Sequence, residues 1–266
     1  MLRQVRGKML SVSTQIARED SLSTFEEMLK SISFANEIII FNMQRNDQEF
    51  RNIANKFHAK IIEVKTPKIV EVIREDQVSS ASGNWVLVMD FDEIITPVLS
   101  TEILKITKEN NSAYSGFNIL RRNYSLGFPL SHGGFGDDYV LRLIHKSSFL
   151  SWPTNIHSTP TFKGKVGKLK NYMEHHKDES VEQMVDKTNR YSDIESQQFL
   201  EGSLPKVVTA TLMRKWWMET LRRGAFKAGF LDGKIGLIQS IYQGFSVFIS
   251  YAKLYEKQIS SKTTKS

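Results

Sequence analysis

The chain has 266 residues, of which 40% are hydrophobic and 24% charged, and its formal net charge is +7. A chain of this length can bury a core of its own, as one large α/β domain or as one domain with a helical appendage. It contains no cysteine, which excludes disulfides and thiolate metal sites. Residues 1–10 are basic but have no apolar core of signal-peptide length, so we expect no signal peptide there.

The predicted elements alternate between strand and helix in the first half of the chain. In chain order, the apolar spacing predicts a helix at 25–34, a strand at 37–41, a helix at 50–57, a strand at 59–64, a helix at 70–82 and a strand at 85–89. A helix at 101–108 and strands at 113–120 and 139–145 follow, and then helices at 181–200, 207–226 and 236–255. The alternation predicts an α/β fold with a mostly parallel sheet flanked by helices.

The strand at 85–89 leads directly into Asp90-Phe91-Asp92-Glu93. Carboxylates at the C-terminal edge of a strand lie where open α/β sheets bind ligands. Asp90 and Asp92 alternate along an extended chain, so we expect them to share a face. Such oxygen ligands suit Mg²⁺ or Mn²⁺ held together with a diphosphate. A bare Asp-x-Asp is more often a solvated acidic turn, but the buried strand before it and the motifs after it favour a site.

Further candidates follow in the middle of the chain. Asp137-Asp138 comes after the Gly-rich segment 131–136 and before a strand that carries Arg142. An acid on a flexible loop near a metal–diphosphate site is a candidate general base, although a simple turn aspartate fits equally well. His157 and the pair at 175–176 follow. A lone loop histidine is usually structural, but three histidines after an Asp-x-Asp favour an imidazole ligand.

Several segments, taken in this order, resemble glycosyltransferase family 2, in particular the branch of bacterial lipopolysaccharide-core β-glucosyltransferases. The matching segments are residues 82–93, 121–127, 133–143, 164–175 and 189–191, with His157 at the family's Val-His-Glu position. The resemblance runs from about Leu10 to Glu256. It implies a GT-A fold, a nucleotide-sugar donor such as a UDP-sugar, a divalent metal (Mg²⁺ or Mn²⁺) and a lipid-linked or cell-envelope glycan acceptor.

The same resemblance implies a role for each candidate residue. It places Asp92, Asp90 and His157 on the metal, Asp90, Arg74 and Asn42 toward the donor, and Gly134, Asp137 and Arg142 on the acceptor side. Asp138 would be the catalytic base of a transfer that inverts the anomeric centre. Metal charge would offset the charge of the departing nucleoside diphosphate.

The N-terminal third departs from the family pattern. Asp20-Ser21 stands where the family usually has Asn-Glu, and Asn42 stands in the loop that usually carries an aspartate. These positions normally grip the nucleobase and ribose, so the donor's identity stays open, whereas Arg74 favours retained diphosphate binding. Two alternatives remain: a catalytically silent sugar- or membrane-binding relative, and a nucleotidyltransferase, whose usual Gly-rich basic signature is not visible.

The positive charge is concentrated in the C-terminal part. From Leu204 onward, basic residues far outnumber Glu219, Asp232 and Glu256. Such asymmetry indicates an anionic partner: a membrane surface, a nucleic acid or an anionic substrate. No recognisable nucleic-acid-reading motif accompanies the charge, so we expect no nucleic-acid partner.

The uncharged run at 235–252 reaches the lower limit for a transmembrane helix, but glutamine, serine and glycine interrupt it. An interfacial helix fits better, and packing on the catalytic domain is the alternative. We therefore expect a transferase domain at 1–203, a basic and apolar helical extension at 204–258 on a membrane surface, and a disordered tail at 259–266. The expected location is cytoplasmic, on the inner face of the cytoplasmic membrane.

Overall fold

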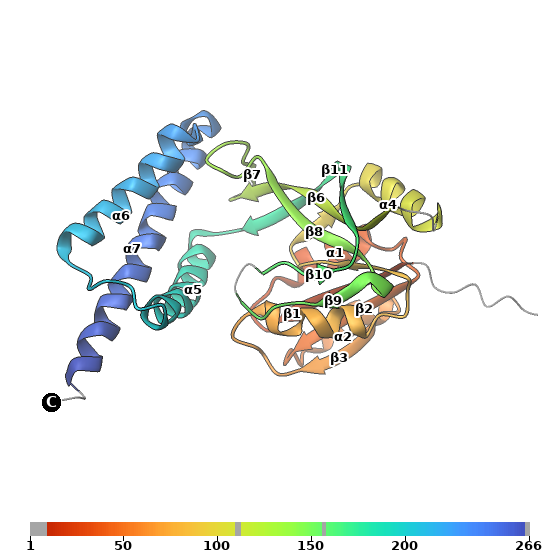
Figure 1. The fold of residues 1–266 in the computed structure, drawn as a ribbon. Helices are drawn as coiled ribbons and strands as arrows, with labels where there is room; N and C mark the ends of the chain where they lie inside the picture. The colour runs from red at the N-terminus through yellow and green to blue at the C-terminus, as the bar shows by residue number, and fades with distance from the viewer. Residues whose placement is uncertain (1–9, 110–112, 156–157, 264–266) are drawn as a thin grey trace, which may run out of the picture. The chain divides into compact units, whose positions relative to one another are not determined.

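The computed structural model of the chain describes residues 10–109, 113–155 and 158–263, and Figure 1 shows its fold. The strands are β1 (Leu10–Ala17), β2 (Glu37–Met43), β3 (Lys60–Val64), β4 (Trp85–Val88), β5 (Glu93–Ile95), β6 (Tyr114–Ser125), β7 (Phe128–Pro129), β8 (Asp138–His145), β9 (Phe149–Ser151), β10 (Thr161–Phe162) and β11 (Lys165–Asp178). The α-helices are α1 (Leu22–Ser31), α2 (Gln48–Lys56), α3 (Arg74–Ser79), α4 (Pro97–Glu109), α5 (Val181–Glu201), α6 (Thr209–Leu221) and α7 (Gly233–Thr263). Short 3₁₀ turns η1 (Val70–Ile73), η2 (Lys146–Ser148) and η4 (Gly229–Asp232) and a π-turn η3 (Arg222–Phe226) complete the chain.

The main sheet has the strand order β3-β2-β1-β4-β8-β6-β11-β5, and β7 pairs with β6 outside that path. The run β3-β2-β1-β4 is parallel, β8 runs antiparallel to β4, and β11 runs antiparallel to β5. The α/β class expected from the sequence is thus confirmed. In this arrangement the C-terminal ends of β1, β2 and β4 lie at one edge, where ligands of α/β sheets bind.

Successive residues of the central strands point to opposite faces of the sheet and fill two separate cores. Trp85 and Leu87 pack in one core with Phe25, Met28 and Leu29 of α1. Val86 and Val88 pack in the other with Val78 of α3. Burial on both faces explains why the strand reads as a continuous apolar run.

Contacts divide the chain into two compact units that interleave along the sequence. The first comprises residues 1–121 and 139–175, and the second comprises 122–138 and 176–266. The Gly-rich segment at 131–136 therefore belongs to the same unit as the helices after residue 204, which the sequence assigned to a separate extension.

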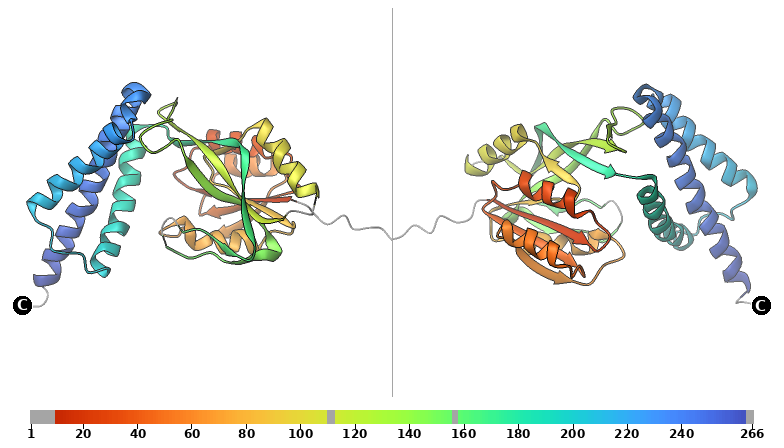
Figure 2. Two further views of the ribbon diagram at one scale, coloured as in Figure 1. Left: turned by 45° about the horizontal axis from the view of Figure 1, so that its top comes forward. Right: turned by 180° about the vertical axis from the view of Figure 1, so that it is seen from behind.

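In the second unit, α7 lies between α5 and α6 and packs against both (Figures 1 and 2). The helix continues to Thr263 and so extends into the segment 259–266, which was expected to be a disordered tail. The Ser260 hydroxyl donates to the carbonyl oxygen of Glu256 at 3.0 Å, an i to i−4 bond that a helix provides.

Candidate active site

The acidic segment after β4 gathers charged side chains in the first unit. Asp90 follows the strand, the chain turns at Phe91 and Asp92, and Glu93 begins β5. The Asp90 amide donates to Glu93 Oε2 at 2.9 Å, which closes the turn on itself. Glu93 is fully buried and Asp92 is 6% exposed. Carboxylates this buried require polar or charged partners.

Asp90 lies between two arginines. Arg74 Nη2 pairs with its Oδ1, and Arg142 Nη2 pairs with its Oδ2. Burial alone would raise the pKa of Asp90, but the guanidinium groups of Arg142 and Arg74 outweigh it and hold that pKa well below its usual range. The carboxylate therefore stays ionised, and both of its oxygens are engaged.

Arg142 connects Asp90 to Glu93. Its Nη2 lies 2.6 Å from Glu93 Oε1, and Arg121 Nη1 approaches the same oxygen at 3.4 Å. Burial lowers the pKa of Arg142, but the carboxylates of Asp90 and Glu93 raise it overall. The sequence assigned Arg142 to the acceptor side, whereas in the structure it neutralises two acids of the Asp-x-Asp-Glu segment.

A buried amide, Gln15 of β1, completes the surroundings of Asp90. Gln15 Nε2 donates to Asp90 Oδ1 at 2.7 Å, and its Oε1 accepts from Arg74 Nη1 at 3.2 Å and Gln77 Nε2 at 2.9 Å. Arg74 is 3% exposed and Gln77 fully buried. The network fixes Arg74 beside Asp90, where the sequence expected a donor-side cation. Gln15 and Gln77 were missed because an isolated glutamine carries no sequence signal.

Asp92 lies beside His175 of β11. The antiparallel pairing of β11 with β5 places His175 opposite Glu93, and His175 Nε2 lies 3.7 Å from Asp92 Oδ1. A carboxylate and an imidazole so placed fit a Mg²⁺ or Mn²⁺ ion that takes its other ligands from a diphosphate and water. Among the described residues, no group of three or more acidic or histidine side chains could hold a metal ion. His157, the histidine that the sequence nominated, lies outside the described residues.

Asn42 is committed to the protein itself. Its Nδ2 donates to Arg45 O at 2.8 Å and to Glu63 Oε2 at 2.7 Å, and its Oδ1 accepts from the Arg45 amide at 3.0 Å. These bonds shape the loop after β2 and leave Asn42 fully buried. The predicted contact between Asn42 and the donor would therefore compete with this loop's own hydrogen bonds.

Arg45 joins the two loops that the sequence singled out as altered. Its Nη1 donates to the carbonyl oxygens of Asp20 at 2.7 Å and Ala17 at 3.2 Å. The Asp20 side chain accepts from the Ala17 amide at 2.7 Å, and Ser21 caps α1 by accepting from the Thr24 amide at 3.3 Å. Asp20 and Ser21 thus organise the backbone after β1. Arg45 thus ties the loop after β2 to the loop after β1, a link that the sequence did not predict.

The second unit contains Asp138, the predicted base. Asn123 of β6, which is 2% exposed, donates through Nδ2 to Asp138 Oδ2 at 3.0 Å and to the carbonyl oxygen of Phe135 at 3.1 Å. The amide thereby ties the half-buried Asp138 to the loop before it, whereas Asp137 is exposed. Asn123 stands in a motif that the sequence identified, but its partner depends on how β6 and β8 pair.

The Gly-rich loop is held by the turn between α6 and α7. The Gly133 amide donates to Lys227 O at 2.8 Å, and Arg223 Nη1 donates to Gly133 O at 2.9 Å. At Gly134, φ is +88° and a Cβ would lie 2.8 Å from Lys227 Nζ, so glycine fits this position without strain. The predicted acceptor-side Gly134 therefore has a packing role as well as a conformational one.

Comparisons with known proteins and the sequence motifs indicate the same class of protein, the glycosyltransferases. No protein-family model matches the chain. It is 26% identical over 268 residues to a Rickettsia typhi protein described as an uncharacterized glycosyltransferase, which covers 96% of this chain and 90% of that protein. A Rickettsia conorii protein with the same description is 27% identical over 247 residues, 86% of this chain and 84% of its own length.

A solved structure shares the fold. The mannosyltransferase PcManGT from Pyrobaculum calidifontis, solved with GDP-Man and Mn²⁺, matches with a TM-score of 0.53 at 12% sequence identity, over 95% of this chain and 89% of that one. The expected GT-A type fold is thereby confirmed. In sequence, the chain is similar to glycosyltransferases over nearly its whole length.

Proposed function

We propose that this chain is an inverting, metal-dependent glycosyltransferase of family 2 that uses a nucleotide-sugar donor, in the first instance a UDP-sugar. The observation that carries the proposal is the Asp92–His175 pair at the end of β4, beside an Asp90 that two arginines keep ionised. The sequence similarity to glycosyltransferases supports it, as does a fold shared with a protein solved with GDP-Man and Mn²⁺.

In this proposal Asp92 and His175 would hold Mg²⁺ or Mn²⁺. The metal would supply positive charge to the leaving nucleoside diphosphate. Asp90 orients Arg74 and Arg142, and those guanidinium groups add positive charge at the same edge of the sheet. Arg142 is thus assigned to the donor side as a positioning residue.

Asp138 takes the proton of the acceptor hydroxyl. Asn123 fixes the carboxylate by donating to Oδ2, so that the acid presents a defined edge to the acceptor. Attack by the acceptor oxygen from the face opposite the departing diphosphate inverts the anomeric centre. Gly134 and Asp137 lie in the loop before β8, and we propose that this loop borders the acceptor. The acceptor class that we propose is a lipid-linked or cell-envelope glycan on the cytoplasmic side of the membrane.

A donor screen tests this function. The purified chain is incubated with a panel of UDP- and GDP-sugars in Mn²⁺, in Mg²⁺ or in excess EDTA, and release of free nucleoside diphosphate is measured. We expect release from at least one donor with metal and none with EDTA. The variant Asp92→Asn should lose it, while Asp76→Asn, which changes an exposed acid of α3, should retain it. If the protein neither binds nor cleaves any donor in the presence of metal, it is a catalytically silent relative instead.

A further inference from the structure

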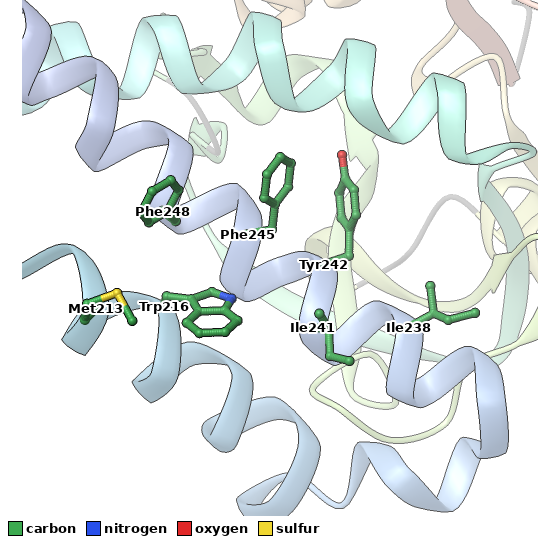
Figure 3. Close-up of a pocket in the computed structure, with 7 residues that line it drawn as sticks. All are labelled: Met213, Trp216, Ile238, Ile241, Tyr242, Phe245 and Phe248. Carbon is green, nitrogen blue, oxygen red and sulfur yellow. The ribbon is translucent and has the colours of Figure 1, made fainter.

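An open apolar groove runs along α7 in the second unit (Figure 3). Its volume is about 670 Å³, and it is lined by Met213 and Trp216 of α6 and by Ile238, Ile241, Tyr242, Phe245 and Phe248 of α7. Sites for small organic ligands typically measure about 300–1,000 Å³. The groove is therefore large enough for a ligand, and its lining is suited to hydrocarbon.

The spacing of the α7 side chains produces the groove. Residues 238, 241, 242, 245 and 248 follow the three- and four-residue steps that place them on one face of a helix. In the middle of this stripe, Tyr242 shares a hydrogen bond of 2.8 Å with Thr188 of α5. At Gly244, an added Cβ would lie 2.9 Å from the carbonyl oxygen of Trp216, so α6 and α7 approach closely there.

The lining is left in contact with solvent. Ile238, Ile241 and Phe245 are 41%, 46% and 40% exposed, respectively. Further exposed apolar side chains occur on α6 and the following turns: Trp217, Met218, Leu221, Phe226, Phe230 and Leu231, each about half exposed or more. So many exposed apolar side chains in one part of a protein usually mark an interaction site.

The segment of the sequence that carries α6 and α7 is positively charged. Residues 204–266 contain eleven lysines and arginines against three acids, a net charge of +8, whereas the whole chain carries +7. Arg214 and Lys215 directly precede Trp216, and Lys215 Nζ lies 4.9 Å from the centre of the Tyr251 ring on α7. Basic residues beside exposed tryptophan and aliphatic side chains are typical of helices at the interface of an anionic membrane.

We propose that this groove takes up a hydrocarbon chain of an anionic membrane phospholipid, with the neighbouring lysines and arginines facing the headgroups. Within the described residues, no helix is long and apolar enough to cross a bilayer. In this proposal α6 and α7 lie at the membrane surface. A hydrocarbon chain seated in the groove covers the apolar side chains of α6 and α7. The positive charge of the neighbouring lysines and arginines selects an anionic lipid. This binding site is independent of the transfer reaction proposed above.

Vesicle flotation tests the proposal, using the full chain and phosphatidylcholine vesicles with or without phosphatidylglycerol. We expect the wild type to float with the anionic vesicles. Ile241→Glu and Phe245→Glu should each weaken binding on the order of tenfold or more, because each replaces a large apolar contact by a charge. Val98→Glu, at a 62% exposed position on α4, is the matched control and should float like the wild type. Unchanged circular dichroism would show that the variants are folded.

Fluorescence quenching shows where the hydrocarbon chain of the lipid binds. In a Trp217→Phe background, phospholipids brominated at mid-chain should quench Trp216, and the quenched signal should disappear when Trp216→Phe is added. Trp85 and Trp152 are 1% and 5% exposed and serve as a constant background.

Other outcomes would overturn the proposal. Flotation that the groove variants do not weaken, without mid-chain quenching, would mean that charge alone attaches the protein. Absence of flotation would also reject it. If light scattering then shows a dimer that Ile241→Glu dissociates, a second copy of the chain covers the groove.

Discussion

Replacing Arg142 by methionine tests whether the ion pairs at the end of β4 hold the site together. Arg142 is 6% exposed and pairs with both Asp90 and the fully buried Glu93. Removing one partner of a buried ion pair typically costs about 3–5 kcal/mol. Because Arg74 still faces Asp90 and Arg121 still approaches Glu93, we expect the lower end of that range, about 3 kcal/mol. Arg142→Lys should cost less, about 1–2 kcal/mol, since an ammonium keeps the charge but not the fork of donors.

The stability difference between wild type and Arg142→Met should also depend on pH in a definite direction. The fold lowers the pKa of Asp90, so its stabilisation is complete above the ordinary aspartate pKa of about 3.9 and is lost as the pH falls through the lowered value. In Arg142→Met, burial raises the pKa of Asp90, and Arg74 and the hydrogen bond from Gln15 remain to oppose it. The stability difference between wild type and variant should therefore be largest near neutral pH and shrink in acid.

Urea denaturation followed by tryptophan fluorescence measures this difference, because Trp85 is buried in the same unit. Arg51→Met, which changes an arginine with a 42% exposed side chain, is the control and should unfold like the wild type. Equal stabilities of wild type and Arg142→Met at pH 7, or a difference that grows in acid, would refute the reasoning.

The remaining predictions concern the loop before β8. Asp138→Asn should lower kcat by about 10²–10⁴-fold with little change in donor affinity, because a general base acts on the acceptor proton, and Asp137→Asn should have little effect. If steady-state kinetics show a large loss of kcat in Asp137→Asn and little effect in Asp138→Asn, the general base is Asp137. Gly136→Ala should distort the loop and lower kcat, since its Cβ would lie 2.2 Å from the Ser131 carbonyl oxygen. Turnover equal to the wild type in Gly136→Ala would show that the loop shape does not matter.

The sequence was sufficient to predict the strand–acid motif and the alternation of strands and helices, because both depend on local apolar patterns. It did not predict β1, whose Ser11, Ser13 and Thr14 are fully buried although they are polar. Ser11 is accommodated by a hydrogen bond to Glu37, which comes from the next strand. Such long-range compensation has no local signature.

The partners within the site were the other omission. β11 carries many lysines and few apolar residues, so its strand character is hard to recognise, and His175 reaches Asp92 only through the β11–β5 register. Arg142 lies in a motif that suggested the acceptor, yet the β4–β8 pairing places it on Asp90. The sequence identified Asp90, Asp92, Arg74 and Arg142 as candidates, whereas strand pairing decided which side chains meet.

The most direct test of the proposed donor site is a calorimetric titration of UDP into the protein with Mn²⁺. It is repeated for Asp92→Asn, His175→Gln and the control His58→Gln, which changes an exposed histidine in the turn after α2. We predict Mn²⁺-dependent UDP binding by the wild type and by His58→Gln, and its loss or a decrease of at least about tenfold in the two site variants. UDP binding that is equally tight with and without Mn²⁺, or that survives unchanged in both site variants, would contradict a metal–diphosphate site at Asp92 and His175.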